Sequence, residues 1–408
     1  MLTQQPPTAH ELQILNDLPT VWIKTDEQLE RLLDELDTLD IIALDTEFIK
    51  RDTFFPRLAL LQINTGTVIY LLDAPKLDLY DFWQVIGDIP TMVLHACGED
   101  LGIYYLLSEL PALTNVFDTQ IGLGFLTGEL SLGYQTALLN TLDIHVNKGE
   151  SQSDWLKRPL TFEQEQYASD DVRYLLALYN ALKQQLNQQN LWQYAKQDCQ
   201  DYSTELYNLS QITDDQLYLN VANFNYNREQ LAILQALCEW REQLARSINR
   251  PRTYILRPKA LQELVEKPPF GIKQLGYHDI KPQVIRMYGN EILNIIHQVQ
   301  KTDCKTYPEL IPIPYRKLPS NIQEALQDLI NAHAKALNIP ENILMRKKWL
   351  GDLYAHAIDN KRALPLALLG WRHDWIIGSL LPTLQNMIQP HSMINNQPVV
   401  ATDTNDEN

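Results

Sequence analysis

Cysteine is scarce in this sequence, with only four among 408 residues. The four lie far apart, at positions 97, 199, 238 and 304, and no two form a Cys-x-x-Cys pair. This distribution argues against a disulfide framework and against a cysteine-ligated zinc site. We therefore expect four reduced thiols and a cytoplasmic protein.

Long hydrophobic runs are also absent. Although 45% of the residues are hydrophobic, no apolar run approaches the ~20 residues that a membrane-spanning helix requires. The first residues, MLTQQPP, show neither a basic start nor an apolar stretch, so no export signal is visible. The composition predicts a soluble chain without a membrane span, and its length predicts two or three domains.

Basic residues are few, and they are unevenly distributed. The chain has 34 Lys and Arg against 51 Asp and Glu, a net charge of −17. Residues 1–208 carry 12 basic against 31 acidic residues, whereas residues 209–408 carry 22 against 20, and within them 225–301 carry 12 against 7. The asymmetry between the halves is informative, although charge alone also fits an acidic half that is merely soluble.

The N-terminal half alternates between strand and helix patterns. We expect strands at 21–24, 41–47, 58–63, 68–72 and 91–95, the third and fourth joined by the turn sequence NTGT. Helical patterns separate and follow them. A three-strand meander followed by strand–helix alternation predicts a mixed sheet flanked by helices.

The strand pattern ends near residue 200. Helical spacing of apolar residues predicts helices at 228–248, 259–266 and 281–300. We therefore expect an α/β domain at 1–208 and a helical domain at 222–302. A proline-rich linker at 303–319 precedes a second all-helical domain at 320–388, and a polar tail at 391–408 is expected to be disordered.

The strand at 41–47 carries two acids, Asp45 and Glu47. Side chains in a strand alternate between faces, so these two carboxylates project from the same side. They repel each other and resist leaving water unless a cation lies between them. This pattern indicates a metal-binding site.

Two further acidic sites could complete it. Glu99 and Asp100 follow an apolar strand and open a helix, where such acids also commonly complement a helix N-terminus; helical spacing does not choose between them. Thr161 and Gln164 form a capping-box pattern for a later helix.

The later helix has a stripe of apolar residues at 168, 172, 175, 179 and 182. At ~100° per residue, Asp171 lies at the edge of this stripe together with Tyr167, whereas Asp170 lies opposite it and is most simply a solvated surface acid. A carboxylate that faces the protein interior, as Asp171 does, loses hydration, and this costs free energy unless a partner or a cation compensates for it. Tyr167 also fits a half-buried tyrosine with a solvated hydroxyl.

These segments together resemble the ribonuclease D family of the DEDD exonuclease superfamily, tyrosine subtype. The resemblance rests on DTEF at 45–48 with FPRL at 55–58, HACGEDL at 95–101, YASDD at 167–171, and Lys148, Ser151, DWL at 154–156 and RPL at 158–160 between them. It continues with WRE at 240–242 and NRP at 249–251, similar to the helicase-and-RNase-D C-terminal (HRDC) domain, and with GWR at 370–372, similar to a second such domain. Cys97-Gly98 and the doubled acid at 170–171 depart from the expected pattern without removing a ligand.

The resemblance implies a ribonuclease H-like α/β exonuclease domain followed by two all-α helical-bundle domains. It also implies two divalent metal ions, Mg²⁺ or Mn²⁺, held by Asp45, Glu47, Asp100 and Asp171. Asp45 would bridge both ions, Glu47 and Asp171 would complete the first and Asp100 would support the second. Tyr167 would position the attacking water. The expected activity is 3′-to-5′ cleavage of RNA, releasing nucleoside 5′-monophosphates, with tRNA precursors bearing 3′ extensions as the partner and no obligate protein partner.

The RNA contacts that this interpretation suggests are less sharply defined by the sequence. Phe48 and His95 could touch the terminal nucleotide by stacking or polar contact, or serve only in packing, and Lys148 could neutralise a phosphate. The basic residues around one interhelical turn, which we predict to contact the phosphate backbone, are Arg246, Arg250, Arg252, Arg257 and Lys259. A solvated basic face is the alternative for each.

Two other functions remain open at this point. A DNA exonuclease would use the same acids, and the sequence shows no contact to a 2′-hydroxyl that would separate it from an RNA enzyme. A catalytically silent nucleic-acid-binding scaffold predicts the loss of at least one acid, yet all four are present.

Overall fold

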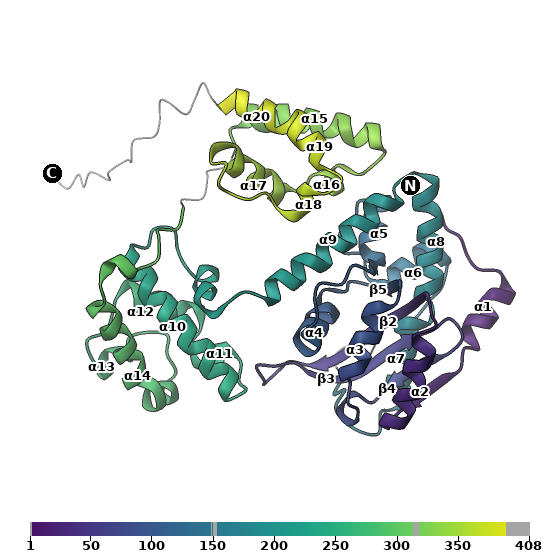
Figure 1. Ribbon diagram of the computed structural model, residues 1–408, viewed down its shortest axis with the longest axis horizontal. Coiled ribbons are helices and arrows are strands. Elements are labelled where there is room, and N and C mark those ends of the chain that lie inside the picture. The colour runs from purple at the N-terminus through teal and green to yellow at the C-terminus, as the bar shows by residue number, and fades with distance from the viewer. Residues whose placement is uncertain (1, 148, 150–152, 313–317, 389–408) are drawn as a thin grey trace, which may run out of the picture.

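The computed structural model describes residues 2–147, 149, 153–312 and 318–388. A six-stranded mixed sheet lies at the centre of the N-terminal half, in the order β1-β4-β3-β2-β5-β6 (Figure 1). The strands are β1 (Thr20–Ile23), β2 (Ile41–Ile49), β3 (Arg57–Asn64), β4 (Ile69–Leu72), β5 (Thr91–Leu94) and β6 (Val116–Asp118). β2, β3 and β4 form an antiparallel meander, and β1, β5 and β6 join it in parallel. The mixed sheet flanked by helices is confirmed.

The five strands expected from the sequence are all present, but β6 was missed. A strand of three residues is too short to show the alternation of apolar and polar residues by which strands are recognised. Its pairing with β5 carries the sheet one strand further and places Asp118 beside the end of β5.

Helices cover both faces of the sheet. One face packs against α2 (Asp26–Leu36), α3 (Tyr80–Asp88) and α4 (Gly98–Ser108) in one hydrophobic cluster. The opposite face packs against helices in a second cluster, and these are α5 (Thr119–Thr127), α6 (Tyr134–Leu142), α7 (Phe162–Arg173) and α8 (Leu175–Gln188). The alternation of strand side chains between the two clusters explains why the central strands are apolar on both sides.

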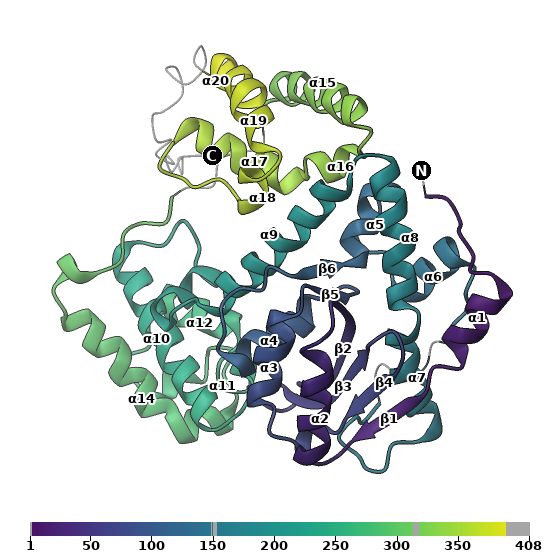
Figure 2. The same ribbon diagram turned by 45° about the vertical axis from the view of Figure 1, so that its right-hand side comes forward.

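The apolar stripe that begins at residue 168 belongs to two helices. Tyr174, with φ −101° and ψ 0°, ends α7 and precedes α8, so the single helix assumed from the spacing is wrong. All five stripe residues are nevertheless buried. Helix α7 contacts β3 and β4, whereas α8 contacts β5, and Figure 2 shows the two helices following each other beside the sheet.

The chain beyond α9 (Trp192–Ser210) is helical wherever it has regular structure. The first block has its own hydrophobic core, formed by η2 (Asp214–Asn220), α10 (Arg228–Ser247), α11 (Arg252–Ile255), α12 (Pro258–Glu266), α13 (Ile272–Leu275) and α14 (Pro282–Lys301). The long helices agree with those expected at 228–248, 259–266 and 281–300. This first helical block lies to one side of the sheet, beyond α9 (Figure 1).

The second helical block packs differently. After η3 (Cys304–Thr306), it contains α15 (Ser320–Leu337), α16 (Glu341–Leu344), α17 (Lys347–Ile358), α18 (Leu366–Leu369), α19 (His373–Trp375), η4 (Ile376–Leu380) and α20 (Leu381–Ile388). Its apolar residues share one hydrophobic cluster with α5 to α9 of the N-terminal half. The domain limits given above remain predictions, and the tail at 391–408 lies outside the described residues.

A small helix, α1 (Ala9–Asn16), precedes the sheet, and η1 (Ala74–Lys76) follows β4. Among the described helices, none combines the length and the apolar character that crossing a bilayer demands.

Candidate active site

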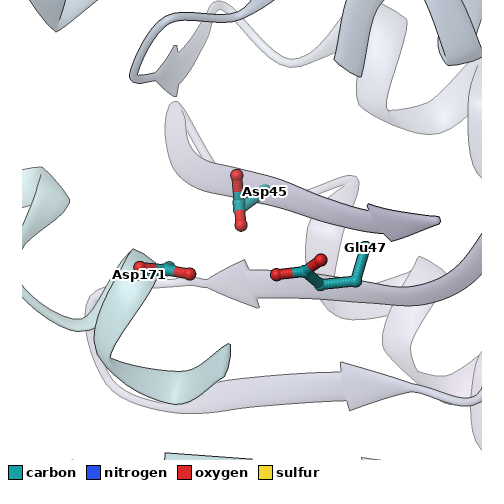
Figure 3. Close-up of side chains that lie close together, drawn as sticks. All are labelled: Asp45, Glu47 and Asp171. Atoms are coloured by element: carbon teal, nitrogen blue, oxygen red, sulfur yellow. The ribbon is translucent and has the colours of Figure 1, made fainter. Parts of the chain in front are cut away.

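Three carboxylates converge beside the C-terminal half of β2. One carboxylate oxygen from each of Asp45, Glu47 and Asp171 lies within 4.8 Å of the others. Figure 3 shows Asp45 and Glu47 on one strand and Asp171 facing them from a helix. The prediction that Asp45 and Glu47 share one face of the strand is confirmed. Because β5 pairs with β2 only at residues Ile41 to Ala43, both acids lie beyond the end of β5, where the sheet opens.

Helix α7 supplies Asp171 and Tyr167, and its position is set at both ends. The expected capping box is formed, with the Thr161 hydroxyl accepting from the Gln164 backbone and the Gln164 side chain accepting from Thr161. At the other end, the Asn64 amide on β3 donates to the carbonyls of Val172 (2.9 Å) and Arg173 (3.1 Å). These contacts tie the helix to the strand next to β2.

Asp170 has a different role from the solvated surface acid expected. Its carboxylate forms a 3.0 Å ion pair with Arg173, almost one turn further along α7, and accepts a 2.8 Å hydrogen bond from Gln166. Arg173 also donates to the backbone carbonyls of Leu15 and Leu18, so Asp170 helps to hold the segment after α1. Helical spacing correctly separated Asp170 from the site, but it could not show that its partner Arg173 also binds backbone carbonyls from the segment around Leu15 and Leu18.

Asp100 reaches the same cavity from the start of α4. It is buried and accepts a hydrogen bond from the Thr46 hydroxyl, which lies between Asp45 and Glu47 in the sequence. Glu99 is exposed at the rim. The geometry therefore favours Asp100 over Glu99, a choice that the sequence spacing had left open.

The four carboxylates are poorly solvated and close together, which raises their pKa values. Burial, followed by repulsion from the other acids, raises the pKa of Asp45 well above its usual range and that of Glu47 to about 9. Burial also raises the pKa of Asp171 to about 7 and that of Asp100 to about 6, with hydrogen bonds from Tyr167 and Thr46 acting in the opposite direction. Such a group of acids can be fully ionised only with a cation between them.

The donor set fits a divalent metal ion. The ligand atoms are carboxylate oxygens only, which is the preference of Mg²⁺ and Mn²⁺ rather than zinc. This chemistry and the convergence of three oxygens are the observations that make the site a metal-site candidate.

Tyr167 stands beside Asp171 in the same cavity. Burial and the nearby carboxylates raise the pKa of its hydroxyl far above the usual value, so the group stays protonated at neutral pH. It can therefore donate a hydrogen bond but does not serve as a base.

A cavity of about 410 Å³ surrounds these groups. Its lining includes Phe48 and His95, whose contact with a nucleotide stays a prediction. Both ring nitrogens of His95 already have partners, Thr119 Oγ1 at 2.8 Å and the Leu132 carbonyl at 3.0 Å. His95 thus offers its ring face and edge rather than a free polar atom.

Tyr134 also lines the cavity, and the sequence did not indicate it. Its hydroxyl donates to the Asp170 carbonyl at 3.2 Å, and its ring lies 5.5 Å from that of His95. A tyrosine at the start of α6 has no spacing relation to the acidic motifs, so only the folded structure brings it to them.

The basic residues predicted to contact RNA lie in the first helical block, away from the cavity lining. The structure gives ion-pair or hydrogen-bond partners to all five: Arg246, Arg250, Arg252, Arg257 and Lys259. Lys148 lies outside the described residues. Contact of these residues with RNA stays a prediction.

Comparison with known proteins places two family models on the chain. Residues 20–187 match the 3′–5′ exonuclease model, and residues 230–296 match the HRDC domain. The first match contains all four carboxylates and Tyr167, and the second coincides with the block formed by α10 to α14.

Relatives match nearly the whole chain. Ribonuclease D of Pseudomonas paraeruginosa is 33% identical over 391 residues, covering 93% of this chain and 99% of the relative. Ribonuclease D of Psychromonas ingrahamii is 34% identical, covering 87% and 97%. The crystal structure of Escherichia coli RNase D, described as an exoribonuclease involved in structured RNA processing, superposes with a TM-score of 0.84 at 25% identity and covers 90% of this chain and 99% of that one. The chain therefore belongs to the ribonuclease D family of metal-dependent 3′–5′ exoribonucleases.

Proposed function

We propose that this protein removes nucleotides from RNA 3′ ends by a two-metal mechanism with Mg²⁺ or Mn²⁺ and releases nucleoside 5′-monophosphates. The observation that supports it most directly is the convergence of Asp45, Glu47 and Asp171 within 4.8 Å on a cavity that also contains Asp100. The silent-scaffold hypothesis has no support, because every acid needed for the chemistry faces this cavity.

Each acid has a role in this proposal. Asp45 and Glu47, from the strand, Asp171, from α7, and Asp100, from α4, would together hold the ions. Bound divalent ions would activate a water and stabilise the leaving 3′-oxygen. Thr46, by donating to Asp100, orients that carboxylate.

The remaining groups act on the nucleotide and the water. Tyr167, whose hydroxyl stays protonated beside Asp171, would position the attacking water through that hydroxyl. Phe48 offers an apolar surface for the terminal base or sugar, and His95 and Tyr134 form the adjoining wall.

We further propose structured RNA, and tRNA precursors with 3′ extensions in particular, as the substrate. The description of the Escherichia coli structure as a processor of structured RNA supports this class, and the HRDC domain adds a second surface for RNA. The four unpaired cysteines, three of them buried, favour a reducing, cytoplasmic environment.

The decisive variant is Asp45→Asn, which keeps the size of the side chain and removes its charge. We expect Mg²⁺-dependent trimming of 3′-extended tRNA to fall by at least about a thousandfold, while RNA binding and the fold are retained. Asp34→Asn, an exposed acid on α2, is the matched control and should behave as the native protein. Wild-type trimming by Asp45→Asn would refute the site assignment.

Substrate class needs a separate measurement. The native protein is incubated with 3′-extended tRNA, single-stranded RNA and single-stranded DNA of matched length, with and without Mg²⁺. Faster release of 5′-monophosphates from the RNAs supports the proposal, whereas equal or faster degradation of DNA favours the DNA exonuclease.

A further inference from the structure

The loop between β2 and β3, residues 50–56, is docked on the first helical block. The side-chain oxygen of Asn249 accepts hydrogen bonds from two consecutive backbone N–H groups of the loop, Phe54 at 3.0 Å and Phe55 at 3.2 Å. Asn249 lies between α10 and α11, almost 200 residues further along the chain. One side chain thus satisfies two backbone donors of a loop from another domain.

Two further hydrogen bonds reach the same loop at Asp52. The Arg250 guanidinium donates to the Asp52 backbone carbonyl at 3.1 Å, and the Tyr254 hydroxyl donates to the Asp52 carboxylate at 2.9 Å. Four hydrogen bonds therefore join residues 52–55 to residues 249–254. A loop held at several points by another domain has few alternative conformations.

Phe54 adds an apolar contact to these hydrogen bonds. Its ring packs against the core of the helical block, with the Arg252 and Arg246 guanidinium groups 4.7 Å and 5.7 Å from its centre. Both arginines form ion pairs with Glu242, whose side chain is 1% exposed. The charges that the sequence suggested for RNA are thus partly engaged in holding the loop.

Asn249 has an unusual backbone conformation that suits this task. Its φ of 45° is in the left-handed region, which asparagine tolerates better than most residues other than glycine. The turn ends α10 and leaves the short side chain facing the loop.

The docked loop continues directly from the catalytic strand. Of β2, only residues Ile41 to Ala43 pair with β5, so Asp45 and Glu47 have a ladder partner on the β3 side alone. The β2–β3 register also shifts between Glu47 and Phe48. The end of β2 that carries Asp45 and Glu47 is therefore held by its pairing with β3 and by the contacts that fix the 50–56 loop.

We propose that Asn249 is a positioning residue for the active site: by docking the 50–56 loop, the HRDC domain holds Asp45 and Glu47 in the geometry that binds the metal ions. This inference rests on the proposed function and deepens it, because it gives the HRDC domain a part in the chemical step besides any binding of RNA.

The test uses a substrate too small to reach the HRDC domain, the p-nitrophenyl ester of thymidine 5′-monophosphate, with Mn²⁺ titrated. Asn249→Gly keeps the left-handed backbone and loses the acceptor, whereas Asn249→Asp keeps both. We expect Asn249→Gly to lower kcat by about tenfold and to need more Mn²⁺ for half-maximal activity, since small misplacements of reacting groups are costly. Asn249→Asp should remain close to the native protein, and so should Arg286→Ala, an exposed basic residue of the same domain.

Hydrogen exchange of residues 50–56 provides a second readout, and it should be faster in Asn249→Gly than in Asn249→Asp. Native-like kcat and Mn²⁺ dependence of Asn249→Gly on the ester would overturn the positioning role, and so would unchanged exchange. A native protein that hydrolyses neither the ester nor RNA would instead refute the proposed function, and the exchange comparison would then decide the docking by itself.

Discussion

Two clusters of buried charge in this protein are built in opposite ways. Where the second helical block meets α9, the Arg372 side chain is 0% exposed and forms a bidentate pair with Asp198, with both N–O distances 2.7 Å. Its remaining donors reach the carbonyls of Leu344 and Ile343. At the outer end of β2, Asp45, Glu47 and Asp171 face one another, and no described Lys or Arg forms an ion pair with them.

Whether the buried charges are paired distinguishes the structural cluster at Arg372 from the functional cluster at Asp45. In the first cluster the charges of Arg372 and Asp198 balance and both groups are hydrogen-bonded, so the pair joins the second helical block to the N-terminal half at no net charge. The second has an excess of negative charge that destabilises the metal-free fold, which is typical of a site prepared for a cation.

The largest effect is expected at the neutral cluster. Arg372→Ala leaves the Asp198 carboxylate without its main partner and should lower the free energy of unfolding by about 3–5 kcal/mol. Urea unfolding followed by tryptophan fluorescence measures it, because Trp349 and Trp371 flank the guanidinium group at 4.9 Å and 4.0 Å.

Arg372→Lys keeps the positive charge but loses the bidentate geometry. Its free energy of unfolding should therefore lie between those of the native protein and Arg372→Ala. Lys347→Ala, an exposed residue of the same block, is the control. A loss below about 1 kcal/mol in Arg372→Ala would place the pair among weak surface ion pairs and would contradict the comparison.

The acidic cluster should respond to metal where the neutral one does not. Mg²⁺ or Mn²⁺ at a hundredfold excess over its dissociation constant should stabilise the native protein by about 2.7 kcal/mol. Asp45→Asn should lose most of this gain, because it removes the ligand nearest the centre of the cluster. Thermal unfolding with metal or with EDTA measures both, and an equal gain in Asp45→Asn would show that the ions bind elsewhere.

The smallest effect is the pH dependence of the metal-free protein. The site acids have raised pKa values, up to about 9 for Glu47 and about 7 for Asp171, so the folded state binds more protons than the unfolded chain. Their stabilising contribution is complete below pH ~4, where unfolded Asp and Glu titrate, and is lost as pH rises through the folded values.

The melting temperature of the EDTA-treated protein should therefore fall between pH 5 and pH 9, and less steeply for Asp45→Asn. Saturating metal should flatten the curve. A metal-free protein that becomes more stable over this range would show that the four acids are not the uncompensated group described here.

Several features were accessible from the sequence because they depend on short-range geometry. The two-residue spacing of Asp45 and Glu47 sets their common face, and the three-residue spacing of Thr161 and Gln164 sets the start of α7. Helical spacing also separated Asp171 from Asp170. The choice of Asp100 over Glu99 came from the family pattern, and the Thr46 hydrogen bond supplies its physical reason.

Other features could not be read from the sequence. β6 has too few residues to show a period, and the division of one apolar stripe into α7 and α8 occurs at a tyrosine without a helix-breaking signal. The basic turn at 246–252 was expected to meet RNA, yet its hydrogen bonds to the 50–56 loop depend on a chain segment almost 200 residues away.

The sequence by itself determined the α/β and helical halves, the strand that bears two acids and the family to which the chain belongs, because strand alternation, helix capping and motif order act over a few residues. Only the tertiary structure decided which charges are neutralised and which are left for a metal. That choice depends on partners from distant segments, as Asp198 and Arg372 have and as Asp45, Glu47 and Asp171 lack among the described residues.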